Sequence, residues 1–375
     1  MRLLIVTFDP PENVGGVEGR AAAYTRELNK ANHFVELIAF SPTYRFTRVR
    51  FQGASLSKYP SSSRRVVRSF RSAVGEISAN SIDSVFLLSG ALTLFGIALL
   101  AFARLVGLRS VVFLYGKDIL GAKESKFRRF ALLTASFLAG RIAVNSRFTA
   151  RLLPEFLSGK LGVVYPGVDP SISTPFPPNP RDGPKRILFV GRLVDRKGAD
   201  DLIRAFSSLA KENDDLLLEI VGAGPEMARL KALALSLGVD ERVRFFGNLT
   251  GRALYERYSM AAVFAMPSKA TSTDVEGFGT VYLEAALFGT PSIGTTTGGI
   301  PEAIQDGVSG LLVPPQDVGA LTEALRELLS DDEKRRLMGA NAQKNVLSKF
   351  TWKASTGSLV RLLGGPEEQV EFLRS

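Results

Sequence analysis

The chain has 375 residues, which suits two domains of about 150–200 residues each better than one. Hydrophobic residues make up 45% and charged residues 22%, and the 35 glycines and 19 prolines follow no period, so disorder, collagen and coiled coil are excluded. Cysteine is absent and His33 is the one histidine, which excludes disulfides, thiolate or poly-histidine metal sites and a cysteine nucleophile.

The net charge of +10 belongs to the first half of the chain. Residues 1–175 hold 23 Lys and Arg against 11 Asp and Glu, whereas residues 176–375 hold 24 against 26, so the balances are +12 and −2. No acidic residue lies between Leu37 and Gly75, where the basic residues are Arg45, Arg48, Arg50, Lys58, Arg64, Arg65, Arg68 and Arg71. Such a patch favours a membrane surface, a phosphorylated lipid, an acidic glycan or nucleic acid as partner, and a solvated basic face is the alternative.

The first half predicts alternating strands and helices. The expected strands are Leu3–Phe8, Phe34–Phe40, Val85–Leu88, Ser110–Leu114, Arg141–Asn145 and Gly162–Tyr165, and the expected helices are Gly19–Lys30, Ala91–Val106 and Lys126–Ala139. The uncharged stretch 84–103 is long enough to span a membrane. Because Gly90, Thr93 and Gly96 interrupt it, a buried strand followed by a helix is favoured. No signal peptide is evident, since Leu3–Val6 is too short for one.

A second series begins after a linker. Six prolines between Gly167 and Lys185 indicate an exposed connection. The strands expected beyond it are Ile187–Val190, Leu216–Val221, Val243–Phe246, Val263–Met266, Ser292–Gly294 and Gly310–Val313, with helices at Asp200–Ala210, Met227–Leu237, Thr280–Phe288 and Val318–Ser330. The alternation predicts two doubly wound α/β domains with parallel sheets, facing a central cleft in which ligands bind outside the carboxyl ends of the strands.

Two of the predicted strands in the second half are followed by loops that suit a phosphate. Arg192 and Lys197 lie five positions apart between Gly191 and Gly198, and two such cations can close on one pyrophosphate. The next loop holds a G-x-G-P turn at Gly222, which either admits a ligand to the backbone or is a plain tight turn. No G-x-G-x-x-G follows the first strand, which argues against a dinucleotide oxidoreductase.

The strongest constellation follows the strand Val263–Met266. Glycines at 277 and 279 lead into a helix near Thr280, whose free amides and dipole form a phosphate site without a metal. Glu276 precedes this helix, and Glu284 lies about one turn inside its apolar sequence. A carboxylate there needs a partner. Sugar or ribose hydroxyls would satisfy it, and a nearby arginine is the alternative.

In order and spacing, these segments resemble the retaining glycosyltransferases of family 4, which have the two-domain GT-B fold. The resemblance covers nearly all of residues 1–360. It rests on G-R-x4-K-G at 191–198, E-x7-E at Glu276 and Glu284, T-G-G-I-P-E-A at 297–303, D-G-x-x-G-L-L-V at 306–313, Y-P-G-V-D at 165–169 and F-T-W at 350–352. It implies an N-terminal acceptor-binding domain at 1–170, a linker at 171–185, a nucleotide-sugar-binding domain at 186–350, and a C-terminal helix at 351–375 that crosses back to the first domain.

The resemblance also implies residue roles. Arg192 and Lys197 would hold the diphosphate and neutralise the leaving group, and Glu276 would contact the transferred sugar near the reacting carbon. The donor-binding residues would be Gly16, Arg192, Lys197, Gly222, Glu276, Phe278, Gly279, Thr280 and Glu284, with Glu284 on the ribose hydroxyls. The family needs no metal or cofactor beyond the nucleoside-diphosphate sugar, and the chain contains no Asp-x-Asp. A phosphate oxygen would take the acceptor's proton.

One segment departs from the family pattern. Where the family often has His-Gly-x-Asp, this chain has Tyr115-Gly116-Lys117-Asp118. Tyr115 stays neutral at physiological pH but can form hydrogen bonds, so Tyr115 and Asp118 are candidate contacts to the sugar or acceptor. His33 does not replace the missing histidine, because Asn32-His33-x-Val35 resembles the family's turn before the second strand.

The function expected from this resemblance is transfer of a hexose, with retention, from a nucleoside-diphosphate sugar to a hydroxyl of a lipid-linked or anionic glycan acceptor. A cytoplasmic protein is expected, with membrane association on the inner face through Arg45–Arg71. The predicted helix with Lys126, Arg128 and Arg129 beside Phe127 and Phe130 would add to that surface. Nucleic acid is not an expected partner. The alternatives are a sugar-nucleotide epimerase of the same fold and a non-catalytic polyanion-binding protein, and the donor base (UDP, GDP or ADP) stays open.

Overall fold

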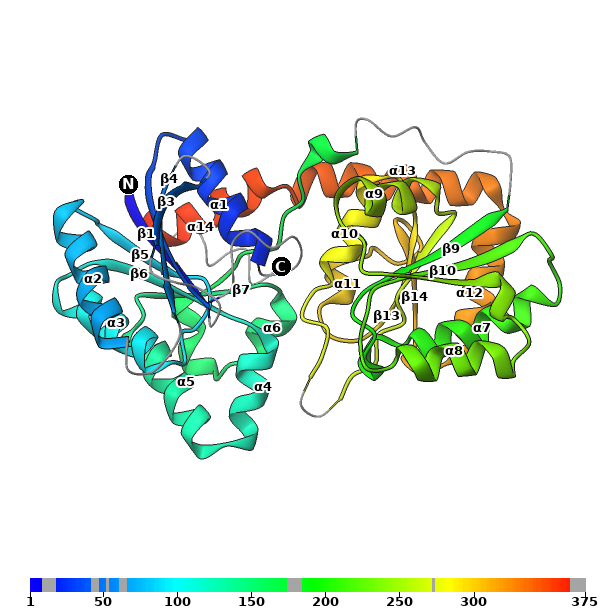
Figure 1. Ribbon diagram of the computed structural model, residues 1–375, viewed down its shortest axis with the longest axis horizontal. Helices are drawn as coiled ribbons and strands as arrows, with labels where there is room; N and C mark the ends of the chain where they lie inside the picture. Colours follow the sequence, from blue (N-terminus) through cyan, green and yellow to red (C-terminus); the bar gives the residue numbers. More distant parts are fainter. Residues whose placement is uncertain are drawn as a thin grey trace. The chain divides into compact units, whose positions relative to one another are not determined.

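The computed structural model describes residues 1–8, 18–41, 47–51, 54–60, 66–173, 184–271 and 274–364 (Figure 1). The chain forms two compact units, one from residues 1–166 together with the segment that begins at Trp352, and the other from Gly167–Thr351. Each unit is a Rossmann-like domain with one sheet and helices on both of its faces. The α/β prediction is therefore confirmed, and most of the expected Pro-rich linker lies outside the described residues.

The sheet of the first unit has eight strands in the order β3-β4-β2-β1-β5-β6-β7-β8. Their bounds are β1 Arg2–Thr7, β2 Phe34–Ser41, β3 Thr47–Phe51, β4 Ala54–Pro60, β5 Ser84–Leu87, β6 Arg109–Leu114, β7 Arg141–Val144 and β8 Leu161–Val163. All neighbouring strands are parallel except β3, which is antiparallel to β4. The strand order reverses between β1 and β5, which is the type of position where α/β folds bind ligands.

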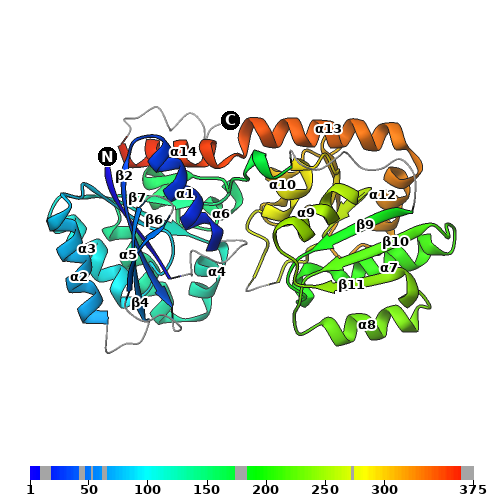
Figure 2. The same cartoon turned by 45° about the horizontal axis from the view of Figure 1, so that its top comes forward.

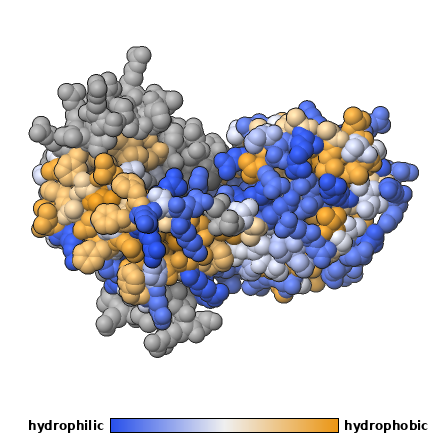
Figure 3. Space-filling model, turned by 90° about the horizontal axis from the view of Figure 1, so that it is seen from below, coloured by the Kyte–Doolittle hydropathy of each residue, from blue (hydrophilic) through white to orange (hydrophobic). Residues whose placement is uncertain are grey.

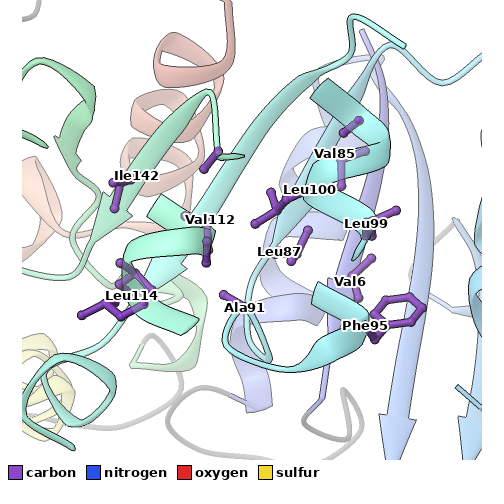
Figure 4. Close-up of a cluster of buried hydrophobic side chains, with 14 of the residues drawn as sticks. Val6, Val85, Leu87, Ala91, Phe95, Leu99, Leu100, Val112, Leu114 and Ile142 are labelled. Atoms are coloured by element: carbon purple, nitrogen blue, oxygen red, sulfur yellow. The ribbon is translucent and has the colours of Figure 1, made fainter. Parts of the chain in front are cut away.

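Both faces of this sheet are buried by helices. The helices are α1 Glu18–Lys30, α2 Val66–Ala79, α3 Leu94–Leu105, α4 Gly116–Glu124, α5 Lys126–Leu138, α6 Arg147–Arg151 and α14 Trp352–Gly364, with a short 3-10 helix η2 at Glu155–Lys160. Side chains alternate along β1, so Leu4 and Val6 pack in a core with α2, α3 and α5, part of which Figure 4 shows, whereas Leu3 and Ile5 pack with α1 and α14. This double burial explains the apolar runs of the sequence.

The uncharged stretch 84–103 forms β5 and α3, as predicted. Thr93 caps α3 because its hydroxyl accepts a hydrogen bond from the Gly96 amide at 3.0 Å. Gly90 makes the turn with φ +77°, and a Cβ there would lie 2.1 Å from the Phe8 ring. Within the described ranges, no helix has both the length and the apolar character needed to cross a membrane.

The sheet of the second unit has six parallel strands in the order β11-β10-β9-β12-β13-β14. The strands are β9 Lys185–Val190, β10 Leu216–Val221, β11 Val243–Gly247, β12 Val263–Ala265, β13 Ser292–Thr295 and β14 Gly310–Val313. The helices are α7 Ala199–Ala210, α8 Met227–Ser236, α9 Gly251–Met260, α10 Thr280–Leu287, α11 Ile300–Ala303, α12 Val318–Ser330 and α13 Asp332–Lys349, which lie on both faces of the sheet (Figure 2). The strand order reverses between β9 and β12.

Helix α14 packs on the first unit although it is the last helix of the chain. The Tyr24 hydroxyl of α1 is hydrogen-bonded to the Ser355 hydroxyl of α14 at 2.9 Å, and Ser355 also donates to the Tyr165 carbonyl at 2.6 Å. The Trp352 ring lies edge-on to Tyr24, with the ring centroids 5.6 Å apart. These contacts and the buried Leu359 fix α14 against α1.

We predict that Leu359→Ala destabilises the first unit. Leu359 is fully buried, so its truncation should lower the free energy of unfolding by about 2–5 kcal/mol, measured by urea denaturation. The matched control is Leu105→Ala in the same unit, because Leu105 is 85% exposed and its loss should change stability by less than about 0.5 kcal/mol. Equal effects of the two variants would contradict the packing of α14.

Candidate donor site at the carboxyl edge of the second sheet

The predicted phosphate-binding loops of the second unit share one edge of its sheet. Strands β9, β10, β12 and β13 are parallel, so the loops that follow them lie at the same edge. The loop after β9 carries Arg192 and Lys197, and the loop after β12 carries Glu276. Because β9 and β12 flank the reversal of strand order, these loops lie at the preferred ligand position of the fold.

Glycines let the loops after β9 and β10 approach each other closely. Gly222 has φ +137°, and a Cβ on it would lie 1.9 Å from the Gly191 carbonyl oxygen. A Cβ on Gly224 would lie 2.2 Å from the Leu193 carbonyl oxygen. The G-x-G turn therefore has a packing role, and contact of Gly222 with a donor stays a prediction.

The T-G-G run after β13 holds the Glu276 loop in the same way. A Cβ on Gly298 would lie 2.1 Å from the Glu276 carbonyl oxygen, and the Gly299 amide donates to that oxygen at 3.0 Å. Gly279, with φ +86°, then begins α10 at Thr280. Since the first amides of a helix lack partners within it, the start of α10 offers hydrogen-bond donors to an anion, as the sequence predicts for Phe278, Gly279 and Thr280.

Glu276 is held by two cations from the loop after β9. Its Oε2 accepts hydrogen bonds from Arg196 Nη1 at 3.1 Å and from Lys197 Nζ. Arg196 Nε also donates to Asp274 Oδ2 at 2.9 Å. Burial alone would raise the pKa of Glu276, but Lys197 and Arg196 hold that pKa below its ordinary value. The carboxylate is therefore ionised at neutral pH.

Arg192 and Lys197, which the sequence analysis assigns to one pyrophosphate, differ in their contacts in the structure. The Lys197 amine is bonded to Glu276, whereas Arg192 is exposed and its guanidinium has no hydrogen bond or ion pair within the described part of the chain. Sequence reasoning missed Arg196. The available signal was its position beside Lys197 in the short 3-10 helix Asp195–Lys197, a turn that brings both side chains to the same carboxylate.

Glu284 lies on α10 without a cation beside it. Its Oε2 accepts a hydrogen bond from the buried Tyr258 hydroxyl at 2.8 Å, and no ion pair to Glu284 occurs in the described ranges. Burial raises the pKa of Glu284, and burial together with Glu284 raises the pKa of Tyr258 well above 10. The alternative that an arginine pairs with Glu284 is wrong among these residues. The carboxylate can still accept hydrogen bonds from a ligand.

In the first unit, Tyr115 and Asp118 lie at the start of α4. The Tyr115 ring stacks on Phe113 with centroids 4.8 Å apart, and its hydroxyl donates to the Leu88 carbonyl at 3.3 Å. Asp118 Oδ2 accepts a hydrogen bond from the Tyr115 amide at 3.0 Å, so this carboxylate caps the helix. Their contacts to sugar or acceptor stay predictions.

Several residues of the predicted site and basic patch lie outside the described residues. They are Gly16, Arg45, Arg64 and Arg65, and the side chains of Arg48, Arg50, Lys58, Arg68 and Arg71 are likewise not described. His33 follows a turn in which Asn32 has φ +59°, which confirms its predicted place before β2. No group of three or more His, Asp or Glu side chains placed to hold a metal ion occurs in the described ranges. Metal independence stays a prediction.

Sequence reasoning also missed Arg20, in the first turn of α1. This arginine is only 4% exposed, and its guanidinium lies over the rings of Phe113 and Tyr115 at 5.6 and 5.3 Å. The signal in the sequence was an arginine directly beside Ala21, which belongs to the inward face of the helix.

The two Rossmann-like units give the chain the GT-B fold, a fold of glycosyltransferases. Solved structures with the same fold include sucrose-phosphate synthase from Thermosynechococcus elongatus (TM-score 0.78, 21% identity, covering 96% of this chain and 98% of that one). HepE from Anabaena in complex with UDP is similar too (TM-score 0.76, 19% identity, 97% and 99%).

The chain belongs to glycosyltransferase family 4. The profile described as Glycosyltransferase Family 4 matches residues 14–172, and the profile described as Glycosyl transferases group 1 matches residues 172–345. The GDP-mannose-dependent alpha-(1-6)-phosphatidylinositol monomannoside mannosyltransferase of Mycolicibacterium smegmatis is 32% identical and is covered over 99% of its length by 98% of this chain. The GDP-mannose-dependent monoacylated alpha-(1-6)-phosphatidylinositol monomannoside mannosyltransferase of Corynebacterium glutamicum is 35% identical over 52% of this chain and 54% of its own.

We predict opposite stability effects for Glu276→Gln and Glu284→Gln at pH 7. The first leaves Arg196 and Lys197 without their carboxylate and should lower the free energy of unfolding by about 1–3 kcal/mol. The second removes a carboxylate that has no cation among the described residues and keeps an acceptor for Tyr258, so stability should stay equal or rise. Thermal unfolding of both variants measures this, and a loss of stability in Glu284→Gln would contradict the described site.

The pH dependence supplies a further check of the same pair. The pKa of Glu276 is lowered from 4.5 in the folded protein, so its contribution to stability is complete above about pH 5 and is lost as the pH falls through the lowered pKa. The pKa of Glu284 is raised, so protonation favours the folded state, and this contribution is lost as the pH rises through the raised value. Glu276→Gln should therefore flatten the acid side of the stability profile.

Proposed function

We propose that the protein transfers mannose from GDP-mannose to a hydroxyl of a phosphatidylinositol mannoside, with retention of configuration. The observation that carries this proposal is the similarity, over nearly the whole of both chains, to the mannosyltransferase of M. smegmatis. Several D-inositol 3-phosphate glycosyltransferases of Corynebacterium are also similar, for example that of C. jeikeium at 36% identity over 53% of this chain and 50% of its own. An inositol-containing acceptor is common to these names.

The donor diphosphate would bind at the carboxyl edge of the second sheet. Among the described residues the exposed Arg192 has no ionic partner, and α10 follows β12, the strand beside β9, so its first amides lie at the same edge of the sheet. Glu284 suits the ribose because a carboxylate accepts two hydroxyl hydrogen bonds and Tyr258 occupies one of its oxygens. Glu276, on the loop just before α10, is the candidate to contact the mannose.

Lys197 would exchange partners when the donor binds. Without donor, the Lys197 amine is bonded to Glu276, whose carboxylate balances the charge of the amine. A diphosphate beside Lys197 and Arg192 would compete for that amine and free part of Glu276 for the sugar. Arg196 would keep the carboxylate oriented during this exchange because it also holds Asp274.

Catalysis would come from groups placed where negative charge develops. As the bond between mannose and the diphosphate breaks, the charge grows on the leaving phosphate oxygen, and Arg192, Lys197 and the start of α10 would stabilise it. The acceptor hydroxyl would attack the anomeric carbon on the face that the phosphate leaves, and its proton would pass to a phosphate oxygen. This chemistry requires no protein base and no metal.

The acceptor would be held by the first unit. Its half of the chain carries the balance of +12, and the basic stretch Arg45–Arg71 suits the phosphate of an anionic lipid. The names of the relatives supply the identity of this lipid, a phosphatidylinositol mannoside.

We predict that GDP, but not UDP or ADP, raises the melting temperature. A nucleotide at about 100 times its dissociation constant adds roughly 2.7 kcal/mol to the free energy of unfolding, which is easily measured by thermal shift. Glu284→Gln should reduce this shift strongly, because it replaces one of the two carboxylate oxygens that would accept from the ribose hydroxyls with an amide NH2 group, without destabilising the protein. A shift with UDP alone would overturn the proposed donor while leaving the donor site intact.

The transfer itself is tested with GDP-mannose and phosphatidylinositol monomannoside, with mass spectrometry of the lipid product and α-mannosidase digestion to read the linkage. Activity should persist in EDTA. Transfer that occurs only with another nucleotide sugar would contradict the proposal. Sensitivity of the product to β-mannosidase alone would contradict retention.

A further inference from the structure

Arg20 is a buried cation for which the described residues supply no counter-ion. Its side chain lies in the first turn of α1 and is 4% exposed, and neither Nε nor Nη1 has a hydrogen-bond partner. No ion pair to Arg20 occurs among the described residues. Burying a guanidinium without an anion beside it costs free energy of folding. In other proteins, removing one partner of a buried ion pair is strongly destabilising, because the remaining charge is left buried without compensation.

The surroundings of Arg20 compensate its charge only in part. The rings of Phe113 and Tyr115 lie 5.6 and 5.3 Å from the guanidinium carbon, which gives cation–π attraction but satisfies no N–H donor. The ordinary explanation is that Arg20 only packs on these rings. That explanation leaves two buried donors unsatisfied in a protein whose other buried polar groups are mostly bonded.

Two helix starts add positive potential at the same place. Arg20 belongs to the first turn of α1, and Tyr115 directly precedes α4, so the amino ends of a 13-residue and a 9-residue helix both lie beside this guanidinium. A planar guanidinium with free donors binds a phosphate oxygen pair in a fork. We propose that Arg20 binds a phosphate group of a ligand. The phosphate of an inositol-containing acceptor and the diphosphate of the donor present the same chemistry.

The proposal predicts a double signature for Arg20→Met. This substitution removes an uncompensated buried charge and keeps a long side chain on the rings, so the melting temperature without ligand should rise by a few degrees. The stabilisation given by inorganic phosphate should be lost. Arg20→Lys, which keeps the charge but not the fork, should retain a reduced response.

The arms of the experiment identify the source of the phosphate. Thermal shifts are recorded with inorganic phosphate, myo-inositol 1-phosphate and GDP. Loss of the inositol phosphate response with an unchanged GDP response assigns Arg20 to the acceptor, and the reverse assigns it to the donor. A lower melting temperature in Arg20→Met with all three responses unchanged would overturn the proposal. None of these readouts needs catalysis, and a failed GDP response in Glu284→Gln tests the proposed donor site separately.

A second and independent observation is an apolar stripe along α5. Phe127, Phe130, Leu133 and Phe137 lie along one side of this helix and are 70, 68, 37 and 65% exposed, whereas Ala131, Leu132, Ala135 and Ser136 face the core. Single exposed apolar residues occur elsewhere in the chain, for example Leu235 and Leu337, but four along one side of a helix form a contiguous patch, which is a feature of interaction surfaces. Figure 3 shows hydrophobic residues gathered over the first unit on this side.

The exposed apolar surface of α5 continues onto α3, because Arg104 near the end of α3 contacts Phe137 near the end of α5. The Arg104 guanidinium of α3 lies 5.0 Å from the Phe137 ring and donates to the Phe137 carbonyl at 3.2 Å. Leu105 and Val106, next to Arg104, are 85% and 51% exposed. We call the surface made by Leu105, Val106, Phe127, Phe130, Leu133 and Phe137 the α3–α5 face.

Cations without carboxylate partners border the α3–α5 face. Lys126, Arg128 and Arg129 are exposed at the start of α5, which has no acidic residue. At its other end Lys160 and Arg141 donate to the carbonyls of Phe137 and Gly159 at 2.9 and 2.7 Å. None of the cations of this border forms an ion pair within the described part of the chain.

We infer that the α3–α5 face docks on an anionic bilayer surface. Phenylalanines enter the boundary between headgroups and acyl chains, while Lys and Arg at the rim attract anionic headgroups. Lysine and arginine outnumber the exposed Glu124 and Glu155 around this face, and this excess favours an anionic surface over an uncharged protein partner. The face is independent of Arg20 and of the donor site, and docking requires no transfer.

Flotation with liposomes tests the docking directly. The wild-type protein should float with vesicles of phosphatidylcholine and phosphatidylglycerol, and much less with phosphatidylcholine alone. Phe127→Ser/Phe130→Ser should reduce the bound fraction at least tenfold, and Arg128→Gln/Arg129→Gln should remove the preference for anionic vesicles. The control is Leu337→Ser on α13, because Leu337 is 64% exposed in the second unit.

Two outcomes would overturn the inference. One is wild-type protein that stays in the soluble fraction with anionic vesicles at low salt. The other is flotation that the aromatic and basic variants leave unchanged while both keep the wild-type melting temperature. Self-association through this face, seen by light scattering and abolished by the aromatic variant without any vesicle binding, would likewise replace a bilayer with a second copy of the chain.

Discussion

The ion cluster at Glu276 is the interaction on which the donor edge depends. Two loops that follow neighbouring strands bring charges of opposite sign, and neither set could remain largely buried without the other. The glycine contacts at 222 and 298 serve the same purpose, because they allow the backbones to approach until the side chains meet. The cluster thus fixes the loops at this edge, at the place where the strand order reverses.

Two other charged groups have no partner of opposite charge in the described part of the chain. Glu284 has a tyrosine hydroxyl but no cation, and Arg20 has aromatic rings but no anion. Each costs folding free energy in the unliganded state, and each would gain on meeting hydroxyls or phosphate. Glu276, in contrast, has two cations beside it and fixes the shape of the loops. In the proposals above, Glu284 and Arg20 are instead the groups that would bind substrate.

Periodicity was enough to predict the two α/β units, because buried parallel strands are continuous apolar runs and their helices are amphipathic. It failed at the edge strand β3 and at its neighbour β4, because their sequences, with Arg48, Arg50 and Lys58, are not apolar runs. The sequence correctly predicted that Glu276 precedes α10 and that Glu284 lies within this helix. The sequence did not predict the contacts of Arg196 and Arg20, because their partners, Glu276 and Tyr115, are distant in the sequence.

The asymmetry of charge along the sequence has a structural counterpart. In the second unit, cations pair with carboxylates: Lys269 is bonded to Asp200 at 2.9 Å, and Arg186 and Arg257 both approach Glu219 at 3.4 Å. In the first unit, Arg104, Arg141 and Lys160 are satisfied by backbone carbonyls, which leaves their charge uncancelled. A carbonyl fixes the position of a cation without neutralising it. Around these three cations the first unit therefore keeps a positive field, although Lys30 and Arg109 of the same unit do pair with Glu27 and Asp83.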